Sequence, residues 1–270
     1  MSDLRWLAVA LALGMATPAD AATKWTALFD GRNLDNFRIA YSSVPVDGRP
    51  ADAMFEVKQG MVHTYPGQQA GTPQPSAYFQ TQGEYSDYVL HLEYKWGDKK
   101  FAPRMARLKD AGIVFHTYED VEHSWPRGIE CQIEDSDVGD LWLISSKADV
   151  ATRPAGYQPK ADPLQDGAPY YDQSGQSRTY GDHGKYVRIR HAADLEHPGW
   201  NSVDVVVRGD SAVYLVNGQP NMRISNMKKW DAASNSWVRL DRGKILFQAE
   251  YAEIYYRNIK IRDVRETDSR

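Results

Sequence analysis

The chain has 270 residues, of which 42% are hydrophobic and 25% are charged, the composition of a globular protein rather than of a disordered or fibrous one. Lys and Arg number 32 and Asp and Glu number 36, which gives a net charge of −4. There is no basic excess to neutralise a nucleic-acid backbone or an anionic membrane, so we expect neither as a partner.

The N-terminal segment, residues 1–22, differs from the rest of the chain. Arg5 precedes an apolar run from Trp6 to Ala16, and the small-residue tripeptide Ala19-Asp20-Ala21 follows. This order is typical of a secretory signal peptide that is removed after residue 21 or 22. The apolar run is too short to span a bilayer as a stable helix. We therefore predict an exported protein without a membrane anchor. Cys131 is the single cysteine, which excludes an intramolecular disulfide.

Alternation with a period of two residues recurs from about Trp25 onward, and no segment keeps helical spacing over three turns. In residues 87–96, for example, Tyr88, Leu90 and Leu92 point one way while Val89 and His91 point the other. Further strands are predicted over Ala53–Val57, Met61–Tyr65, Gly112–Tyr118, Ile129–Glu134, Leu141–Ser145, Tyr186–His191, Ser202–Arg208, Ala212–Val216, Lys244–Glu250 and Glu253–Val264. This pattern predicts one all-β domain over residues 23–268, a two-sheet antiparallel β-sandwich or jelly roll.

Two connections stand out between these strands. Asn217-Gly218 supplies the two positive φ angles that a type I′ hairpin requires, so we predict a tight hairpin over residues 216–219. Residues 148–184 are rich in Gly, Pro, Gln, Ser and Asp and show little periodicity, so we predict a long loop that forms one wall of a cleft.

The strand over residues 129–134 carries the strongest candidate site. Glu130, Gln132 and Glu134 share one face of it, and apolar residues share the other. A carboxylate in this row can act as acid or base and an amide can orient a substrate, although a sheet with one solvated face gives the same pattern. Glu130 and Glu134 lie about 13 Å apart along an ideal strand, beyond the separation of about 5 to 5.5 Å of a retaining carboxylate pair.

His116 lies on another predicted strand, where it is a candidate base or a structural hydrogen-bonding group. No His-Glu-x-x-His motif signals zinc, and a divalent cation held by scattered oxygen atoms stays open. No glycine-rich phosphate loop follows a strand, and no G-x-S-x-G motif occurs, so nucleotide cofactors and serine hydrolysis are not indicated.

Several runs together resemble the 3-keto-disaccharide hydrolase domain family. They are Leu28–Gly31, Asp110–His116, Trp125–Ile133, Gly139–Trp142, Gly199–Asn201, Val216–Gly218, Gly243–Glu250 and Tyr256–Ile259. Departures from the family pattern are Tyr251, where the family usually has Gly, and Ala111, where a small polar residue is usual.

The resemblance implies a concanavalin-like jelly roll in an exported, periplasmic or secreted bacterial protein that acts on glycosides oxidised at C3. It carries candidate roles onto the matching polar positions. These are Glu130, His116 and Glu250 as catalytic residues, and Gln132, Trp200, Asn201, Gln248 and Arg257 as substrate-binding residues, with Asn217 as a further match. Glu134 joins the substrate-binding group because it shares the face of Glu130.

The implied chemistry starts from the C3 ketone, which acidifies the proton at C2. A base removes that proton while the substituent at C1 leaves, and water then adds back to give net hydrolysis. Glu130 is the first choice for the base, Glu250 the second and His116 the third, with Gln132, His116 or Arg257 as donors to the enolate. Two alternatives stay open: a conventional glycosidase that uses Glu130 and Glu134, and a non-catalytic carbohydrate-binding domain.

Overall fold

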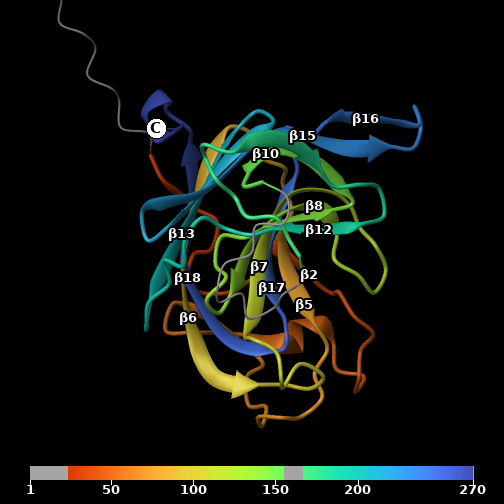
Figure 1. Cartoon of the computed structure of the whole chain (residues 1–270). Coiled ribbons are helices and arrows are strands. Elements are labelled where there is room, and N and C mark those ends of the chain that lie inside the picture. Colours follow the sequence, from red (N-terminus) through yellow and green to blue (C-terminus); the bar gives the residue numbers. More distant parts are fainter. Residues whose placement is uncertain (1–23, 155–166, 270) are drawn as a thin grey trace, which may run out of the picture.

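The computed structural model describes residues 24–154 and 167–269, and its strands form two antiparallel sheets (Figure 1). Within these residues the large sheet has the order β11-β10-β15-β14-β13-β6-β18-β4-β3, with β1 beside β18 and β16 beside β15. Its strands are β1 (Thr26–Ala27), β3 (Phe55–Lys58), β4 (Met61–Thr64), β6 (Tyr88–Lys100), β10 (Ser146–Thr152), β11 (Gln176–Tyr180), β13 (Asn201–Arg208), β14 (Ser211–Val216), β15 (Gln219–Asp231), β16 (Ser236–Arg239) and β18 (Ala252–Asp263).

The small sheet has the order β12-β9-β8-β7-β17-β5-β2 in the same residues. Its strands are β2 (Phe37–Tyr41), β5 (Ala77–Thr81), β7 (Asp110–Glu119), β8 (Arg127–Glu134), β9 (Leu141–Ile144), β12 (Tyr186–Ile189) and β17 (Lys244–Ala249). Two short 3-10 turns, η1 (Ala51–Met54) and η2 (Glu266–Ser269), complete the elements. The predicted all-β, two-sheet antiparallel sandwich is confirmed.

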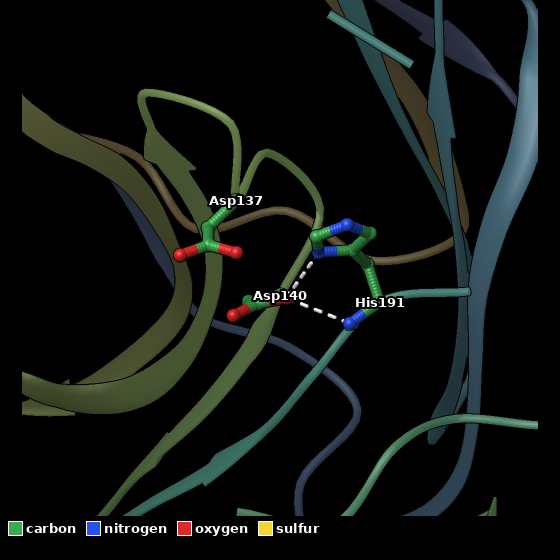
Figure 2. A group of neighbouring side chains, drawn as sticks. All are labelled: Asp137, Asp140 and His191. Carbon is green, nitrogen blue, oxygen red and sulfur yellow. Dashed lines mark hydrogen bonds and ion pairs between the residues drawn. The ribbon is translucent and has the colours of Figure 1, made fainter. Parts of the chain in front are cut away.

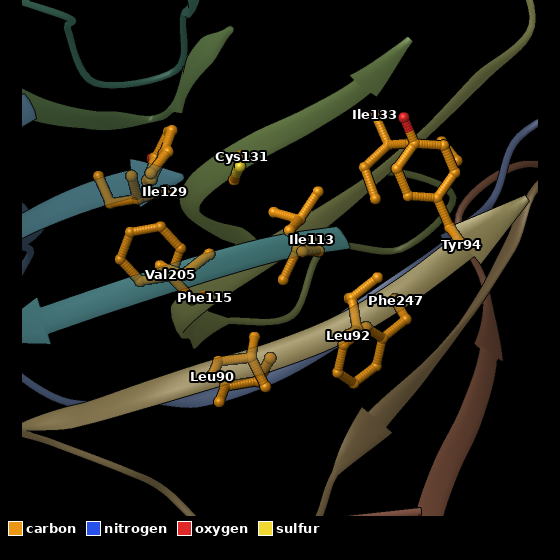
Figure 3. Close-up of a cluster of buried hydrophobic side chains, with 14 of the residues drawn as sticks. Leu90, Leu92, Tyr94, Ile113, Phe115, Ile129, Cys131, Ile133, Val205 and Phe247 are labelled. Carbon is orange, nitrogen blue, oxygen red and sulfur yellow. The ribbon is translucent and has the colours of Figure 1, made fainter. Parts of the chain in front are cut away.

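The main hydrophobic core lies between the two sheets (Figure 3). Leu90 and Leu92 of β6 and Val205 of β13 come from the large sheet and face side chains of the small sheet. The facing side chains are Ile113, Phe115, Ile129, Cys131, Ile133 and Phe247. Alternation along β8 therefore turns Ile129, Cys131 and Ile133 inward, and the intervening polar residues must face away from the large sheet.

Two local predictions can be compared directly with the structure. Asn217 and Gly218 have φ values of 50° and 77°, and Val216 pairs with Gln219, so the tight hairpin is confirmed. The strand predicted from Ala53 begins at Phe55, because residues 51–54 form the turn η1.

The long loop predicted over residues 148–184 is wrong in part. β10 and β11 pair there as antiparallel strands, from Ala148 opposite Tyr180 to Thr152 opposite Gln176. Residues 155–166 lie outside the described residues, as does the predicted signal peptide. In the part of the chain that is described, no helix is long and apolar enough to cross a membrane.

Candidate active site

A cleft of about 1010 Å³ opens on the face of the small sheet that points away from the core. Its floor comes from β7, from β8 and from Glu250, which directly follows β17. Its walls come from strand β12 and from the loop that precedes β7. Its lining residues are Lys100, Arg104, Ala106, Arg107, Leu108, Asp110, Trp125, Glu130, Gln132, Glu134, Trp142, Tyr186, Arg188 and Glu250. Another hollow, of about 900 Å³ over residues 32–57, lacks such a carboxyl cluster, so the cleft is the candidate site.

The strand register arranges the cleft floor in rows. Glu134 of β8 pairs with Asp110 of β7, and Asp110 forms a bridge with Glu250. In the next row Gln132 pairs with Gly112. Antiparallel pairing thus brings carboxyl groups that are 116 residues apart in the sequence, at positions 134 and 250, to either side of one aspartate.

Gly112 makes room for the carboxyl group of Glu130. A Cβ atom at Gly112 would lie 2.2 Å from Glu130 Oε1 and 2.8 Å from Gln248 Oε1. Gln248 Nε2 donates a hydrogen bond of 2.8 Å to Glu130 Oε1. The Glu130 carboxyl group therefore lies over Gly112, a floor position without a side chain, and is held there by an amide.

Burial determines the ionisation of Glu130, which is 5% exposed. Desolvation, with a further contribution from Asp110, raises the pKa of Glu130 to about 8. Its direct partner in the described residues is the neutral Gln248 amide rather than a cation. A carboxyl group in this environment holds its proton at neutral pH.

Glu250 has a different environment in the same cleft. Arg104 Nη2 lies 2.7 Å from Glu250 Oε1, and the other terminal nitrogen of Arg104 donates to Asp110. Burial raises the pKa of Glu250 to about 7, against the opposing effect of the Arg104 charge. Burial and the neighbouring carboxyl groups also raise the pKa of Asp110, which accepts a hydrogen bond of 2.9 Å from Gln132 Nε2.

Glu134 belongs to an ion-pair network at one end of the floor. Arg188 Nη2 lies 2.7 Å from Glu134 Oε2 and 3.1 Å from Asp137 Oδ2, and its Nε donates to Asp140 at 2.6 Å. The Asp140 carboxylate also accepts two bonds of 2.6 Å from the backbone N–H and Nδ1 of His191 (Figure 2). Burial acts to raise the pKa of Asp140, but His191 and Arg188 hold it below its usual value.

Asp137, Asp140 and His191 are the only trio of close candidate metal ligands among the described residues. The two aspartates face cationic groups, because both oxygens of Asp140 accept hydrogen bonds and Arg188 Nη2 and Arg190 Nη1 each lie 3.1 Å from an oxygen of Asp137. A guanidinium in contact with both aspartates repels a metal ion. These residues therefore do not fit a metal ion.

The walls of the cleft are aromatic. The Trp125 and Trp142 side chains are half-buried, and Tyr186 is 48% exposed. The Arg188 guanidinium lies 5.5 Å from the ring centroid of Trp142. Aromatic faces above a polar floor suit the apolar faces and the hydroxyl groups of a sugar.

The structure brings five of the predicted site residues together and leaves four outside the cleft. Glu130, Gln132, Glu134 and Glu250 line the cleft, and Gln248 contacts Glu130. The residues outside are His116, Trp200, Asn201 and Arg257.

His116 lies in the core. The pairing of β7 with β8 shifts register after Phe115, and His116 has a φ of 49°, so its ring packs against Tyr88 and Phe115. Burial lowers the pKa of His116 to about 4, which keeps the imidazole neutral. Its position separates it from the carboxyl groups of the cleft.

Trp200, Asn201 and Arg257 belong to the large-sheet side. The Arg257 guanidinium lies 3.8 Å from the Trp200 ring centroid and pairs with Glu93 at 2.6 Å. Asn201 donates to the carbonyl of His197 at 2.8 Å and accepts from Asn217 at 2.8 Å, so it holds a loop.

Other site residues were not singled out by the sequence. Arg104 sits in an irregular loop without periodicity, and Arg188 lies in an ordinary strand. Asp110 and Gly112 fall inside the Asp110–His116 run, which is the one signal that pointed to them.

Three solved structures similar to this chain are of bacterial proteins. Two come from Parabacteroides distasonis ATCC 8503, each described as a proposed glycosyl hydrolase. The first is 20% identical, covers 89% of this chain and 100% of its own, and has a TM-score of 0.50. The second is 17% identical, covers 89% and 94%, and has a TM-score of 0.49. A Bacillus licheniformis beta-glucanase is 10% identical over 92% of this chain and 100% of its own, with a TM-score of 0.43.

Comparison with the curated proteins found no match. At these identities the structural likeness concerns the fold alone. The family comparison is more specific, because the profile of the 3-keto-alpha-glucoside-1,2-lyase-like domain matches residues 24–262, nearly all of the chain that follows the predicted signal peptide. The chain belongs to the family of the 3-keto-alpha-glucoside-1,2-lyase-like domain.

Proposed function

We propose that this protein cleaves the glycosidic bond of 3-keto-glycosides by removing the C2 proton and eliminating the C1 substituent, followed by addition of water. One observation carries the proposal: of the four buried carboxyl groups that line the cleft, those of Asp110, Glu134 and Glu250 contact a guanidinium, whereas that of Glu130 accepts a hydrogen bond from an amide. Membership of the family supports a carbohydrate-active function. The 3-keto substrate and the order of steps are our own inference.

The two environments favour a division of roles. Glu250, next to Arg104, ionises before Glu130, so while Glu250 is ionised and Glu130 still holds its proton, Glu250 is the base and Glu130 is the acid. This reverses the order expected from the sequence, in which Glu130 was the first choice for the base. The reversal follows from Arg104, whose place beside Glu250 no sequence pattern indicated.

The bond changes balance as follows. Glu250 takes the proton from C2, and the electron pair of the C2–H bond passes into an enolate with the C3 ketone. The enolate then forms the C1=C2 double bond as the C1–O bond breaks, and Glu130 gives its proton to the departing oxygen. Water adds across C1=C2, with its proton at C2 and its hydroxyl at C1, to complete net hydrolysis.

The amide groups of the floor suit a sugar substrate. Gln132 and Gln248 each donate from Nε2 to a carboxyl group, Asp110 and Glu130 respectively. Among the described residues, their buried Oε1 atoms have no hydrogen-bond partner. Buried acceptors of this kind are costly unless a ligand donates to them, and sugar hydroxyl groups are such donors.

The test uses matched nitrophenyl glucosides, one native and one oxidised at C3, with the protein from residue 22 onward. We expect nitrophenol release from the 3-keto compound above its spontaneous breakdown, and none from the native glucoside. Release from the native glucoside alone would contradict the proposal in favour of a conventional glycosidase. Binding of the 3-keto compound without turnover would favour a carbohydrate-binding domain instead.

A further inference from the structure

Tyr251 directly follows Glu250 and has an unusual backbone conformation. Its φ is +60°, in the left-handed region that disfavours residues with a bulky side chain. A glycine would adopt this conformation at lower cost. A tyrosine here suggests that the side chain has a role that offsets the cost.

The ring of Tyr251 contacts the cation of the cleft. The guanidinium carbon of Arg104 lies 5.3 Å from the ring centroid of Tyr251, within cation–π distance. The same guanidinium lies 2.7 Å from Glu250 and donates to Asp110. The ring is thus a third contact that holds this guanidinium beside the two carboxyl groups.

The backbone of Tyr251 also anchors the loop that carries Arg104. The carbonyl of Tyr251 accepts a hydrogen bond of 2.9 Å from the N–H of Phe101, and the carbonyl of Phe101 accepts one of 3.0 Å from the N–H of Arg104. The N–H of Tyr251 donates at 2.9 Å to the hydroxyl of buried Tyr65, whose own proton goes to the carbonyl of Pro75 at 3.0 Å. Tyr251 therefore contacts the Arg104 guanidinium through its ring and, by way of Phe101, holds the backbone of the Arg104 loop through its carbonyl.

We propose that Tyr251 is a positioning residue of the cleft, which holds the Arg104 guanidinium against Glu250 through its ring. The inference rests on the proposed function only for its consequence in catalysis, where Glu250 is the base. Other polar and titratable groups that bear on Glu250 are retained in Tyr251→Gly; they are Asp110, Glu130, Glu134, Trp125, Tyr65, Tyr186 and Tyr256. Loss of the ring frees Arg104 to turn toward solvent and weakens the positive charge at Glu250.

The direct test is titration of the Glu250 carboxyl carbon by NMR in protein labelled with 13C at glutamate, with the signal assigned by its loss in Glu250→Gln. We expect Tyr251→Gly to move the titration midpoint upward by about half a pH unit or more. Tyr251→Phe, which keeps the ring, should titrate like the unaltered protein. Gln59→Gly is the matched control, because Gln59 also has a positive φ, of 53°, and lies exposed outside the cleft lining.

An unchanged midpoint in Tyr251→Gly would overturn the inference, and so would an equal shift in Tyr251→Phe. Turnover gives a second measurement: the rising limb of the pH profile should move upward in Tyr251→Gly and stay in place in Tyr251→Phe. If no glycoside is turned over, the proposed function fails while the titration still decides the role of Tyr251. If turnover is found but neither limb nor midpoint moves, the role of Tyr251 alone is refuted.

Discussion

At the scale of single residues, Glu130 and Glu250 are both nearly excluded from water, yet their partners differ. Glu130 accepts from an amide, whereas Glu250 contacts a guanidinium. Opposite charge favours the ionised form of a carboxyl group and burial favours the neutral form. The two environments therefore allow two residues of the same type to differ in role, with Glu130 as the acid and Glu250 as the base.

Substitution by glutamine should separate these roles through the leaving group. Glu130→Gln should keep most of its rate on a 3-keto nitrophenyl glucoside, because nitrophenolate departs without a proton. It should lose about a hundredfold or more on a 3-keto-disaccharide, whose sugar alkoxide needs one. Glu250→Gln should lose at least about a hundredfold on both substrates, measured as kcat/KM at the pH optimum.

The reverse pattern would assign the base to Glu130, in agreement with the order expected from sequence. Equal losses on both substrates in both variants would remove the division of roles. Circular dichroism of each variant checks that the comparison is made between folded proteins.

The pH dependence of kcat/KM on a 3-keto-disaccharide should be a narrow bell. Activity should rise as Glu250 ionises near pH 7 and fall as Glu130 loses its proton near pH 8, because the reaction needs one ionised and one protonated carboxyl group. The falling limb should be absent with the nitrophenyl substrate, whose leaving group departs without a proton, both in the unaltered protein and in Glu130→Gln. A limb that persists there would have to come from another group.

At the scale of the strands, Gly112 of β7 leaves the space that the Glu130 carboxyl group occupies. Gly112→Ala places a methyl group where Glu130 Oε1 now lies, 2.2 Å from the ideal Cβ position. The clash is with the end of a side chain, so we expect the sheet to persist and the carboxyl group to move. Activity should fall at least about tenfold on a 3-keto-disaccharide, since small displacements of a catalytic group are costly.

The matched control for this variant is Gly83→Ala. Its added Cβ would meet only the Tyr85 hydroxyl at 3.9 Å, and Gly83 has no positive φ. Gly83→Ala should therefore leave both melting temperature and kcat/KM close to their original values. A fully active Gly112→Ala would show that the position of Glu130 over this gap is not needed.

Strand alternation allowed part of this site to be predicted. It placed Glu130, Gln132 and Glu134 on one face of β8 with Ile129, Cys131 and Ile133 on the other, as the structure shows. Alternation fails where a strand is irregular. The register shift in β7 after Phe115 carries His116 into the core, although its position in the sequence suggested a catalytic side chain.

Alternation also does not say which sheet a strand joins. Trp200, Asn201 and Arg257 were grouped with the site by resemblance, but pairing places β13 and β18 in the large sheet. Arg104 could not be found from periodicity, because its loop has none and its contacts with Glu250 and Asp110 form only when β7 and β17 pair. Strands β10 and β11 were likewise not predicted, because polar residues are frequent in their sequences.

At the scale of the whole molecule, the buried carboxyl groups couple stability to pH. Burial raises the pKa of Glu130 to about 8, so between its ordinary value of 4.5 and pH 8 the folded state holds a proton that the unfolded state has lost. Stability from this group is fully present below about pH 4.5 and is lost as the pH rises through about 8.

Glu130→Gln, which cannot ionise, should therefore raise the melting temperature relative to the unaltered protein, and by more at pH 8 than at pH 5. A difference of a few degrees is expected, measured by differential scanning calorimetry in matched buffers. A variant that is equally destabilised at both pH values would show that Glu130 is not held neutral by burial.

The fate of the C2 hydrogen tests the central proposal most directly. A 3-keto-glucoside carrying deuterium at C2 is incubated with the protein in ordinary water, and the sugar product is analysed by mass spectrometry beside a sample without protein. We predict that the product loses its deuterium and that the reaction slows with a primary isotope effect, because the C2–H bond breaks before the glycosidic bond. Cleavage at an unchanged rate with deuterium kept at C2 would contradict elimination and point to direct displacement at C1.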